Sequence, residues 1–135
     1  MGVEENRMVI ERFRAEHGVL SGDWAGTPLL LLHTVGARSG TPYVNPVMFL
    51  ERDGRIYVFA SAGGRPRNPG WLYNLRAHPA VTVELGPDTF TAVAKEVTGA
   101  EREAVYSEQE QQFPAYREFR EHAGRTIPVI ALDRA

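Results

Sequence analysis

The amino-acid sequence predicts an α+β protein built on a mainly antiparallel β-barrel, with helices packed outside it. Two pairs of neighbouring strands are joined by short turn sequences, Asp53-Gly54 and Gly86-Pro87-Asp88, which are typical of antiparallel hairpins. Few of the other connections are long enough to carry the chain from one parallel strand to the next. The pattern gives about six strands and three to four helices, as in a small barrel.

Composition limits the kind of protein. The chain has 135 residues, and we expect one domain over residues 1–135 with a core of its own. It has no cysteine, which excludes disulfides and thiolate chemistry, and its histidines show no H-x-x-x-H spacing, so we expect no metal site. The net charge of −2 argues against nucleic acid as a partner. The sequence has no signal-peptide core and no apolar run of roughly 18 residues, so we expect a cytoplasmic protein.

A helix is expected over residues 3–20, because Ile10, Phe13 and Leu20 recur on one face while glutamate and arginine fill the other. The apolar face favours packing on the core. The alternatives are a lid over the site or a peripheral contact with a membrane, which would make the protein membrane-associated. A connector is expected to follow over residues 24–28.

Apolar runs, alternation and turn residues predict the remaining elements. Strands are predicted over residues 29–35, 43–51, 55–60, 80–85, 89–97 and 127–132. Helices are predicted over residues 70–77, 98–112 and 116–123. Asn68 and Pro69 are expected to be the N-cap and first residue of the helix 70–77. Thr98 and Glu101 have the spacing of a capping box. Because a helix interrupts the path after the strand 55–60, we expect the barrel to be open there, with an edge that a second copy could cover.

Two glycine-rich segments are candidate anion sites. The first, T-V-G-A-R-S-G-T-P-Y-V-N-P over residues 34–46, lies between two apolar runs. Gly36 and Gly40 permit positive φ and close backbone approach, and small residues in a turn can direct several backbone N–H groups at an anion. Arg38 adds a planar guanidinium that suits phosphate or carboxylate. The alternative interpretation is a polar β-turn with a surface arginine.

The second segment is S-A-G-G-R-P-R-N over residues 61–68, which leads into the start of the helix 70–77. Backbone donors and the helix dipole favour an anion at such a position. Between His33 and His78, six arginines oppose two acidic residues, a local excess of four positive charges in an otherwise acidic chain. This local field suits a small anionic ligand better than a polyanion, and the two segments could flank one ligand.

An aromatic stripe lies near the C-terminus. Phe113, Tyr116 and Phe119 are three residues apart and share one helical face. Such a stripe is commonly part of a core. Because glutamate and arginine crowd around it, the stripe could instead line a pocket.

These segments together resemble the deazaflavin (coenzyme F420)-dependent nitroreductase family. The resemblance is carried by G-x-x-S-G-x-P, by N-P-x-W-x-x-N-L, and by F-P-A-Y-R-E-F near a C-terminal R-T-I-P-V. It covers the chain from about residue 28 to residue 132. It implies a split β-barrel of the FMN-binding split-barrel type. It also implies an F420H2-dependent oxidoreductase that transfers a hydride from reduced coenzyme F420 to a small-molecule electron acceptor, which can be a quinone, an enone or a nitroaromatic compound.

The resemblance also implies roles for individual residues. The family's phosphate-binding turn matches Arg38, Ser39 and Gly40, with a further contact near Tyr43. The residues that match its contacts to the deazaflavin ring are Pro46, Met48, Ala60, Ser61, Trp71 and Asn74. Its substrate pocket matches Phe113, Tyr116 and Phe119.

Ser61 and Tyr116 are the predicted catalytic residues, because a hydroxyl aimed at the acceptor oxygen would stabilise the charge that develops there. The sequence departs from the family pattern at Ala62, where a basic residue often follows the serine, and we expect Arg65 and Arg67 to compensate. Of the three aromatic positions only Tyr116 keeps a hydroxyl, which makes the pocket more apolar and leaves quinone or enone reduction open.

Two other functions fit the same sequence. One is an FMN-binding split-barrel oxidoreductase, and the other is a non-catalytic carrier of the deazaflavin or of a lipid. A homodimer would be compatible with each of these functions.

Overall fold

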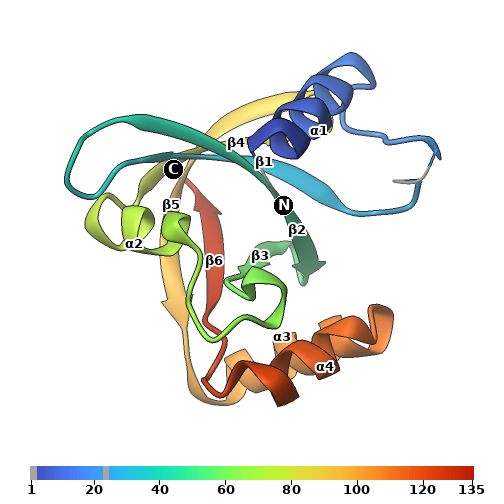
Figure 1. Ribbon diagram of the computed structural model, residues 1–135, viewed down its shortest axis with the longest axis vertical. Coiled ribbons are helices and arrows are strands. Elements are labelled where there is room, and N and C mark those ends of the chain that lie inside the picture. The colour runs from blue at the N-terminus through green and yellow to red at the C-terminus, as the bar shows by residue number, and fades with distance from the viewer. Residues whose placement is uncertain (1–2, 23–24) are drawn as a thin grey trace.

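The computed structural model describes residues 3–22 and 25–135 (Figure 1). Trp24, the first residue of the expected connector, lies outside these ranges. The strands are β1 (Leu29–Val35), β2 (Pro42–Arg52), β3 (Arg55–Phe59), β4 (Ala80–Leu85), β5 (Asp88–Val97) and β6 (Val129–Arg134). The helices are α1 (Val3–Ala15), α2 (Gly70–Ala77), α3 (Gly99–Gln112) and α4 (Ala115–Ala123), with a short 3-10 turn η2 (Ala62–Gly64). Apart from α1, the predicted elements differ from these bounds by no more than two residues at either end.

The strands form one closed antiparallel barrel in the order β1-β2-β3-β6-β5-β4. The prediction of an open barrel was therefore wrong. The barrel closes because β1 also pairs with β4, through a short register that runs from Leu31 opposite Glu84 to His33 opposite Thr82. The segment that carries η2 and α2 leaves the barrel after β3 and returns at β4, so it interrupts the connection without opening the sheet.

Both predicted hairpins form. β2 and β3 pair up to Arg52 opposite Arg55, and the two turn residues Asp53 and Gly54 have φ values of 54° and 77°. Positive φ at both central positions is the geometry of a type I′ turn, which matches the twist of the flanking strands. β4 and β5 pair up to Leu85 opposite Asp88.

Side chains alternate between two cores along the strands. The interior of the barrel contains Leu30, Leu32, Val58 and Ile130, and Leu72 of α2 joins this cluster at one end of the barrel. A second cluster lies outside the sheet, where Tyr57, Phe59, Tyr106 of α3 and Tyr116 of α4 pack together. Figure 1 shows α3 and α4 on one side of the barrel and α1 on the opposite side. Full burial of a large apolar side chain contributes about 1.5–3 kcal/mol, so both clusters stabilise the fold.

α1 ends at Ala15 rather than at residue 20, which corrects the predicted boundary. His17 has φ 55° and Gly18 has φ 80°, and the Gly18 N–H donates to the Phe13 carbonyl at 2.9 Å. This bond and the His17 N–H to Arg14 carbonyl bond of 3.4 Å have the pattern of a Schellman C-cap. A side chain at position 18 would also collide with the backbone of Gly86, so the chain turns here against the β4–β5 hairpin.

α1 packs on the barrel, as the first of the three interpretations predicted. Val9 and Phe13 are buried with Leu29 and Leu31 of β1, whereas Met8 is 66% exposed. None of the helices in the described part of the chain is long and apolar enough to cross a membrane.

Two predicted helix caps are absent, although both helices begin near the expected residues. Pro69 is the N-cap residue of α2, and the Asn68 side chain accepts a bond from Arg125 instead. Thr98 is the N-cap residue of α3 but makes no side-chain cap bond. Glu101 accepts bonds of 2.7 Å from Arg55 and from the Tyr57 hydroxyl, because β3 brings these stronger partners next to it.

Candidate functional site

A cleft of about 1160 Å³ opens between the β1–β2 turn, the first half of β2, the loop after β3, the start of α2, and α4. Most of the predicted site residues line it, namely Arg38, Ser39, Tyr43, Pro46, Met48, Ser61, Arg65, Arg67, Trp71, Asn74 and Tyr116. Gly40, Ala60, Phe113 and Phe119 are not among its lining residues. Asn6 of α1 and Phe59 of β3 also line the cleft and were not predicted.

The turn over residues 36–41 is closed by its own hydrogen bonds. Gly36 N–H donates to the Thr41 carbonyl at 2.8 Å, and Gly40 N–H donates to the Gly36 carbonyl at 3.1 Å. Ser39 Oγ accepts from Thr41 N–H at 3.1 Å. Gly40 has φ 71°, and a side chain at Gly36 would collide with Ser39 Oγ. Gly40 therefore has the predicted positive φ, and Gly36 allows the predicted close approach.

Asn74 connects this turn to α2. Its Oδ1 accepts from the Ala37 N–H at 3.1 Å, and its Nδ2 donates to Thr34 Oγ1 at 3.1 Å. The N–H groups of Gly36, Gly40 and Thr41 are thus paired within the turn, and that of Ala37 is paired with α2. Among the described residues, the N–H groups of Arg38 and Ser39 have no such acceptor. Any backbone anion site in this turn is therefore confined to these two donors and the guanidinium of Arg38.

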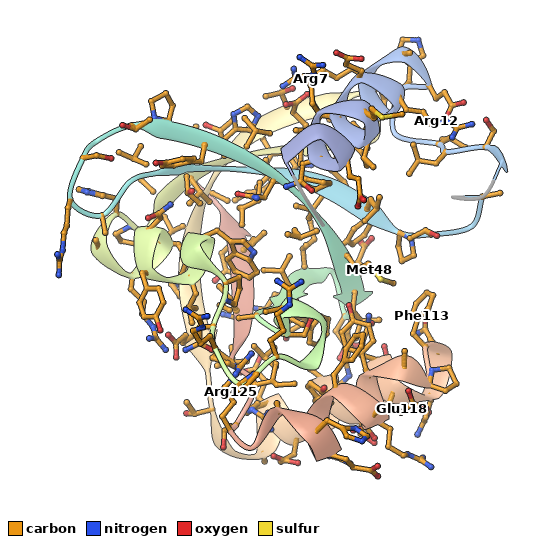
Figure 2. All side chains as sticks on the ribbon, in the orientation of Figure 1. Arg7, Arg12, Met48, Phe113, Glu118 and Arg125 are labelled. Carbon is orange, nitrogen blue, oxygen red and sulfur yellow. The ribbon has the colours of Figure 1, made fainter. Side chains whose placement is uncertain are left out.

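The loop over residues 61–68 is held mainly by Arg125, which follows α4 (Figure 2). Its Nη2 donates to the carbonyls of Ala60 at 3.2 Å and of Ser61 at 3.0 Å. The same nitrogen lies 3.0 Å from the Arg67 carbonyl, and Nε donates to the Arg65 carbonyl at 3.1 Å. The sequence did not predict a role for this arginine, because its hydrogen-bond partners lie far from it in the chain and no nearby motif indicates them.

Ser61 and Tyr116 come together at the inner end of the cleft, from the loop after β3 and from α4. Tyr116 is only 6% exposed, and burial raises the pKa of its hydroxyl. Gln109 and Ser61 lie near enough to act in the opposite direction and lower it, but burial has the larger effect. The hydroxyl therefore remains protonated at neutral pH and can donate a hydrogen bond.

Gln109 was also missed by sequence reasoning. It is fully buried on α3, and both polar atoms of its amide lack a hydrogen-bond partner among the described residues. The sequence predicts that this helix is acidic and exposed, so nothing in it indicated that Gln109 would be buried.

The ring of Tyr116 is enclosed by other aromatic rings. Phe59, Phe119 and Tyr106 lie edge-on to it, with centroid distances of 5.5, 5.1 and 6.2 Å. The Tyr106 hydroxyl donates to the Tyr116 carbonyl at 2.7 Å, which ties α3 to α4. Phe113 and Phe119 pack against the same cluster, so the stripe is chiefly core, and Tyr116 is its member on the cleft.

The local excess of positive charge is smaller in the structure than in the sequence. Arg52, Arg55 and Arg76 are paired with carboxylates that lie outside the segment 33–78. These carboxylates belong to Glu108, to Glu101 and Asp133, and to Glu96 respectively. Arg38, Arg65 and Arg67 line the cleft, and no described carboxylate pairs with them.

The cleft therefore has an apolar inner part and a cationic outer part. Met48, Phe59 and Trp71 supply flat or flexible apolar surface, and Arg38, Arg65 and Arg67 supply positive charge. This combination fits a ligand with a flat ring system at one end and anionic groups at the other.

Comparison with known proteins identifies the family. The family model for F420H(2)-dependent quinone reductases matches residues 5–134. The F420H(2)-dependent quinone reductase Rv1261c of Mycobacterium tuberculosis is 34% identical over 139 residues, which cover 99% of this chain and 93% of that protein. The chain belongs to the F420H(2)-dependent quinone reductase family. It is an oxidoreductase, and its cofactor is coenzyme F420.

Solved structures agree with this assignment. A structure described as the F420-H2 dependent reductase FDR-A is 34% identical, with a TM-score of 0.72 and coverage of 78% of this chain and 94% of its own. A second, described as a domain-swapped dimer, is 32% identical, with a TM-score of 0.73 and coverage of 97% and 96%. The predicted split-barrel fold and F420 dependence are confirmed, and they are supported over the FMN protein and the non-catalytic carrier.

Proposed function

We propose that this oxidoreductase reduces a quinone at the inner end of the cleft, and that Ser61 and Tyr116 donate hydrogen bonds to the quinone oxygen. The observation that carries the proposal is the meeting of these two hydroxyls, from segments far apart in the sequence, on the wall of one cleft. Both residues are buried, so water competes little for their hydrogen bonds.

The outer part of the cleft is proposed to hold the anionic part of the cofactor. Arg38 and the backbone of the turn 36–41 would bind its phosphate, and Arg65 and Arg67 would face its acidic tail. Pro46, Met48 and Trp71 would pack on the deazaflavin ring, which leaves the acceptor between the ring and Tyr116. Placing the two reactants in contact in a dry site is the main contribution that a protein makes to such chemistry.

Reduced coenzyme F420 supplies the hydride in this family. The chain's own hydroxyls would stabilise the negative charge that develops on the acceptor oxygen. Because this charge is greater in the transition state than in the bound quinone, the hydrogen bonds would raise turnover more than affinity. The apolar surroundings of Tyr116 favour a flat, weakly polar acceptor, which supports a quinone over a nitroaromatic compound.

The proposal is tested by stopped-flow oxidation of the bound, reduced cofactor by menadione. Tyr116→Phe is expected to keep the cofactor affinity and to slow this step roughly tenfold or more, the effect of one lost charge-assisted hydrogen bond. Tyr57→Phe is the matched control, because the Tyr57 hydroxyl donates to Glu101 away from the cleft. Wild-type rates in both Tyr116→Phe and Ser61→Ala would show that neither hydroxyl acts on the acceptor.

We propose a homodimer, because a relative of 32% identity is described as a domain-swapped dimer. Light scattering coupled to size-exclusion chromatography would test it. A peripheral membrane contact would have to use the outer face of α1, where Met8 is exposed, since Val9 and Phe13 are buried on the barrel. Co-sedimentation with anionic lipid vesicles would test that contact.

A further inference from the structure

We propose that Arg125 is a positioning residue for the cofactor. Its guanidinium binds the carbonyl groups of Ala60 and of three residues of the loop 61–68, together with the side chain of Asn68, and so directs backbone N–H groups of that loop toward the cleft. The inference rests on the proposed function, in which this loop contacts coenzyme F420. Arg125 itself is not among the residues that line the cleft, so it would act through the loop rather than on the ligand.

The acceptors of Arg125 are almost all backbone oxygens. Its guanidinium donates to the carbonyls of Ala60, Ser61, Arg65 and Arg67, at distances between 3.0 and 3.2 Å. Its Nη1 donates to Asn68 Oδ1 at 2.7 Å, which is the shortest of these bonds. A guanidinium has five N–H groups in one plane, and this fan of donors can reach several carbonyls that converge on one point.

The direction of each carbonyl decides the direction of the next amide. The chain has no cis peptide bond among its described residues, so each C=O is antiparallel to the N–H of the residue that follows. The carbonyls of Ala60, Ser61 and Arg67 point at Arg125. The N–H groups of Ser61, Ala62 and Asn68 therefore point away from the guanidinium.

These three amides are available to a ligand. Ser61, Ala62 and Asn68 all line the cleft. None of their N–H groups has a backbone or side-chain acceptor among the described residues, although buried or half-buried amides are normally paired. A row of unpaired N–H groups on a cleft wall suits a ligand with carbonyl or anionic oxygens.

The loop needs an outside support because its own conformation is unfavourable. Ala62, Gly63 and Gly64 have φ values of 50°, 66° and 83° in succession, and a positive φ is costly for alanine. The bonds within the loop are from Gly64 N–H to the Ser61 carbonyl and from Arg65 N–H to the Ala62 carbonyl. Arg125 supplies the remaining contacts from a segment that the barrel and α4 hold in place.

Arg125 also leaves its charge uncompensated. Burial lowers its pKa, but an arginine stays ionised in proteins. The partners of its guanidinium are neutral, and no carboxylate among the described residues pairs with it. Its positive charge therefore adds to that of Arg65 and Arg67 beneath an anionic ligand.

The test compares Arg125→Lys and Arg125→Met with the wild type in three measurements: thermal unfolding, amide hydrogen exchange over residues 61–68, and fluorescence titration with oxidised coenzyme F420. Arg125→Lys keeps the charge but loses the planar fork. We expect the exchange of Gly64 and Arg65 to become faster in this variant, and the Kd for F420 to rise roughly tenfold to a hundredfold. Arg125→Met removes the charge as well and should give the larger rise.

Arg117→Lys is the matched control, because Arg117 is exposed on α4 and should leave all three measurements unchanged. Free guanidinium at millimolar concentration should partly restore F420 binding in Arg125→Ala, whereas equal concentrations of sodium chloride should not. If Arg125→Lys leaves the F420 affinity unchanged while Ala62→Pro or Arg65→Ala weakens binding, the loop binds the cofactor but Arg125 does not position it. Unchanged affinity in all of these variants would instead show that the loop does not bind the cofactor, and the proposed placement would fail with it.

Discussion

The two glycine-rich segments beside the cleft look alike in sequence but are built differently. The turn 36–41 closes on itself, since Gly36, Gly40 and Thr41 donate to acceptors within six consecutive residues. The loop 61–68 has few internal bonds and is held by Arg125 from the C-terminal part of the chain. A local segment can therefore form one wall of the site, while the wall that contains the loop 61–68 depends on the folded barrel.

The difference predicts how each wall responds to mutation. Changes in the turn should act locally, because its hydrogen bonds do not involve α4. The effects of substitutions in the loop on stability and on F420 affinity should depend on the contacts that α4 and Arg125 make with it.

Gly64→Ala should cause the largest loss. Gly64 has φ 83°, and an added Cβ would lie 2.9 Å from Phe119 Cα, which is backbone that cannot rotate away. We expect a loss of about 3 kcal/mol in the free energy of unfolding, together with weaker F420 binding. Chemical denaturation and fluorescence titration would measure both.

Gly63→Ala is the control for that variant. Gly63 has φ 66°, but an added Cβ would meet nothing within 4 Å. It should lose only about 1 kcal/mol, the cost of a left-handed conformation for alanine. Equal losses in the two variants would mean that contact with α4 does not support the loop.

Arg38→Ala should weaken F420 binding with little change in stability, because Arg38 is exposed on the turn. The loss of a charge-assisted contact to phosphate, about 1.5–3 kcal/mol, corresponds to roughly a tenfold to hundredfold rise in Kd. Added salt should reduce the wild-type advantage. Identical titration curves for variant and wild type would remove the phosphate site from this turn.

Gly36→Ala should cost about 1 kcal/mol of stability, because the new methyl group would displace Ser39 Oγ and break its bond to Thr41 N–H. Ser39→Ala should cost a similar amount by removing the same bond. The double variant should lose less than the sum of the two, since the hydroxyl that causes the collision is gone. Additive losses in urea denaturation would show that the closed turn is not the local unit described above.

Asp133 is not among the residues that line the cleft, and its substitution should have the smallest effect on stability. Its bond to Arg55 holds the pKa of the Asp133 carboxyl below its ordinary value of 3.8. The native state therefore releases this proton more readily than the unfolded chain, so the pair stabilises the fold above pH 3.8 and loses this effect as the pH falls through the lowered pKa. Since both side chains are partly exposed, we expect about 1 kcal/mol or less.

Asp133→Asn should flatten the acid limb of a plot of unfolding free energy against pH and leave F420 affinity unchanged. Glu121→Gln, an exposed change on α4, provides the comparison. A change in cofactor affinity in Asp133→Asn would show that the barrel wall and the cleft are coupled.

Sequence alone determined the features that depend on neighbours in the chain. Alternating apolar residues predicted the strands, and Asp53-Gly54 predicted the first hairpin with its positive φ values. The positive φ of Gly40 and the close approach at Gly36 could be predicted because a turn of six residues contains most of its own hydrogen bonds. The family resemblance, carried by motifs of the same short range, predicted the fold and the cofactor, and most of the residues that it implies for the site line the cleft.

Tertiary structure decided the features that depend on partners distant in the chain. The barrel is closed by the pairing of β1 with β4. The capping box at Thr98 does not form, because the Glu101 carboxylate accepts hydrogen bonds from Arg55 and Tyr57 instead. Three of the six arginines between His33 and His78 are paired with carboxylates from β5, β6 and α3, which no local count of charge includes.

The wall that contains Ser61 shows the same limit most clearly. The hydrogen bonds of Arg125 join residues that are 57 to 65 positions apart in the sequence. Nothing near Arg125 in the sequence indicates these partners. Gln109 likewise lies near Tyr116 only because α3 and α4 pack side by side, although its amide atoms have no hydrogen-bond partner among the described residues. Hydrogen-bond geometry is set by positions in space, and a sequence specifies those positions only after the barrel and its helices have folded.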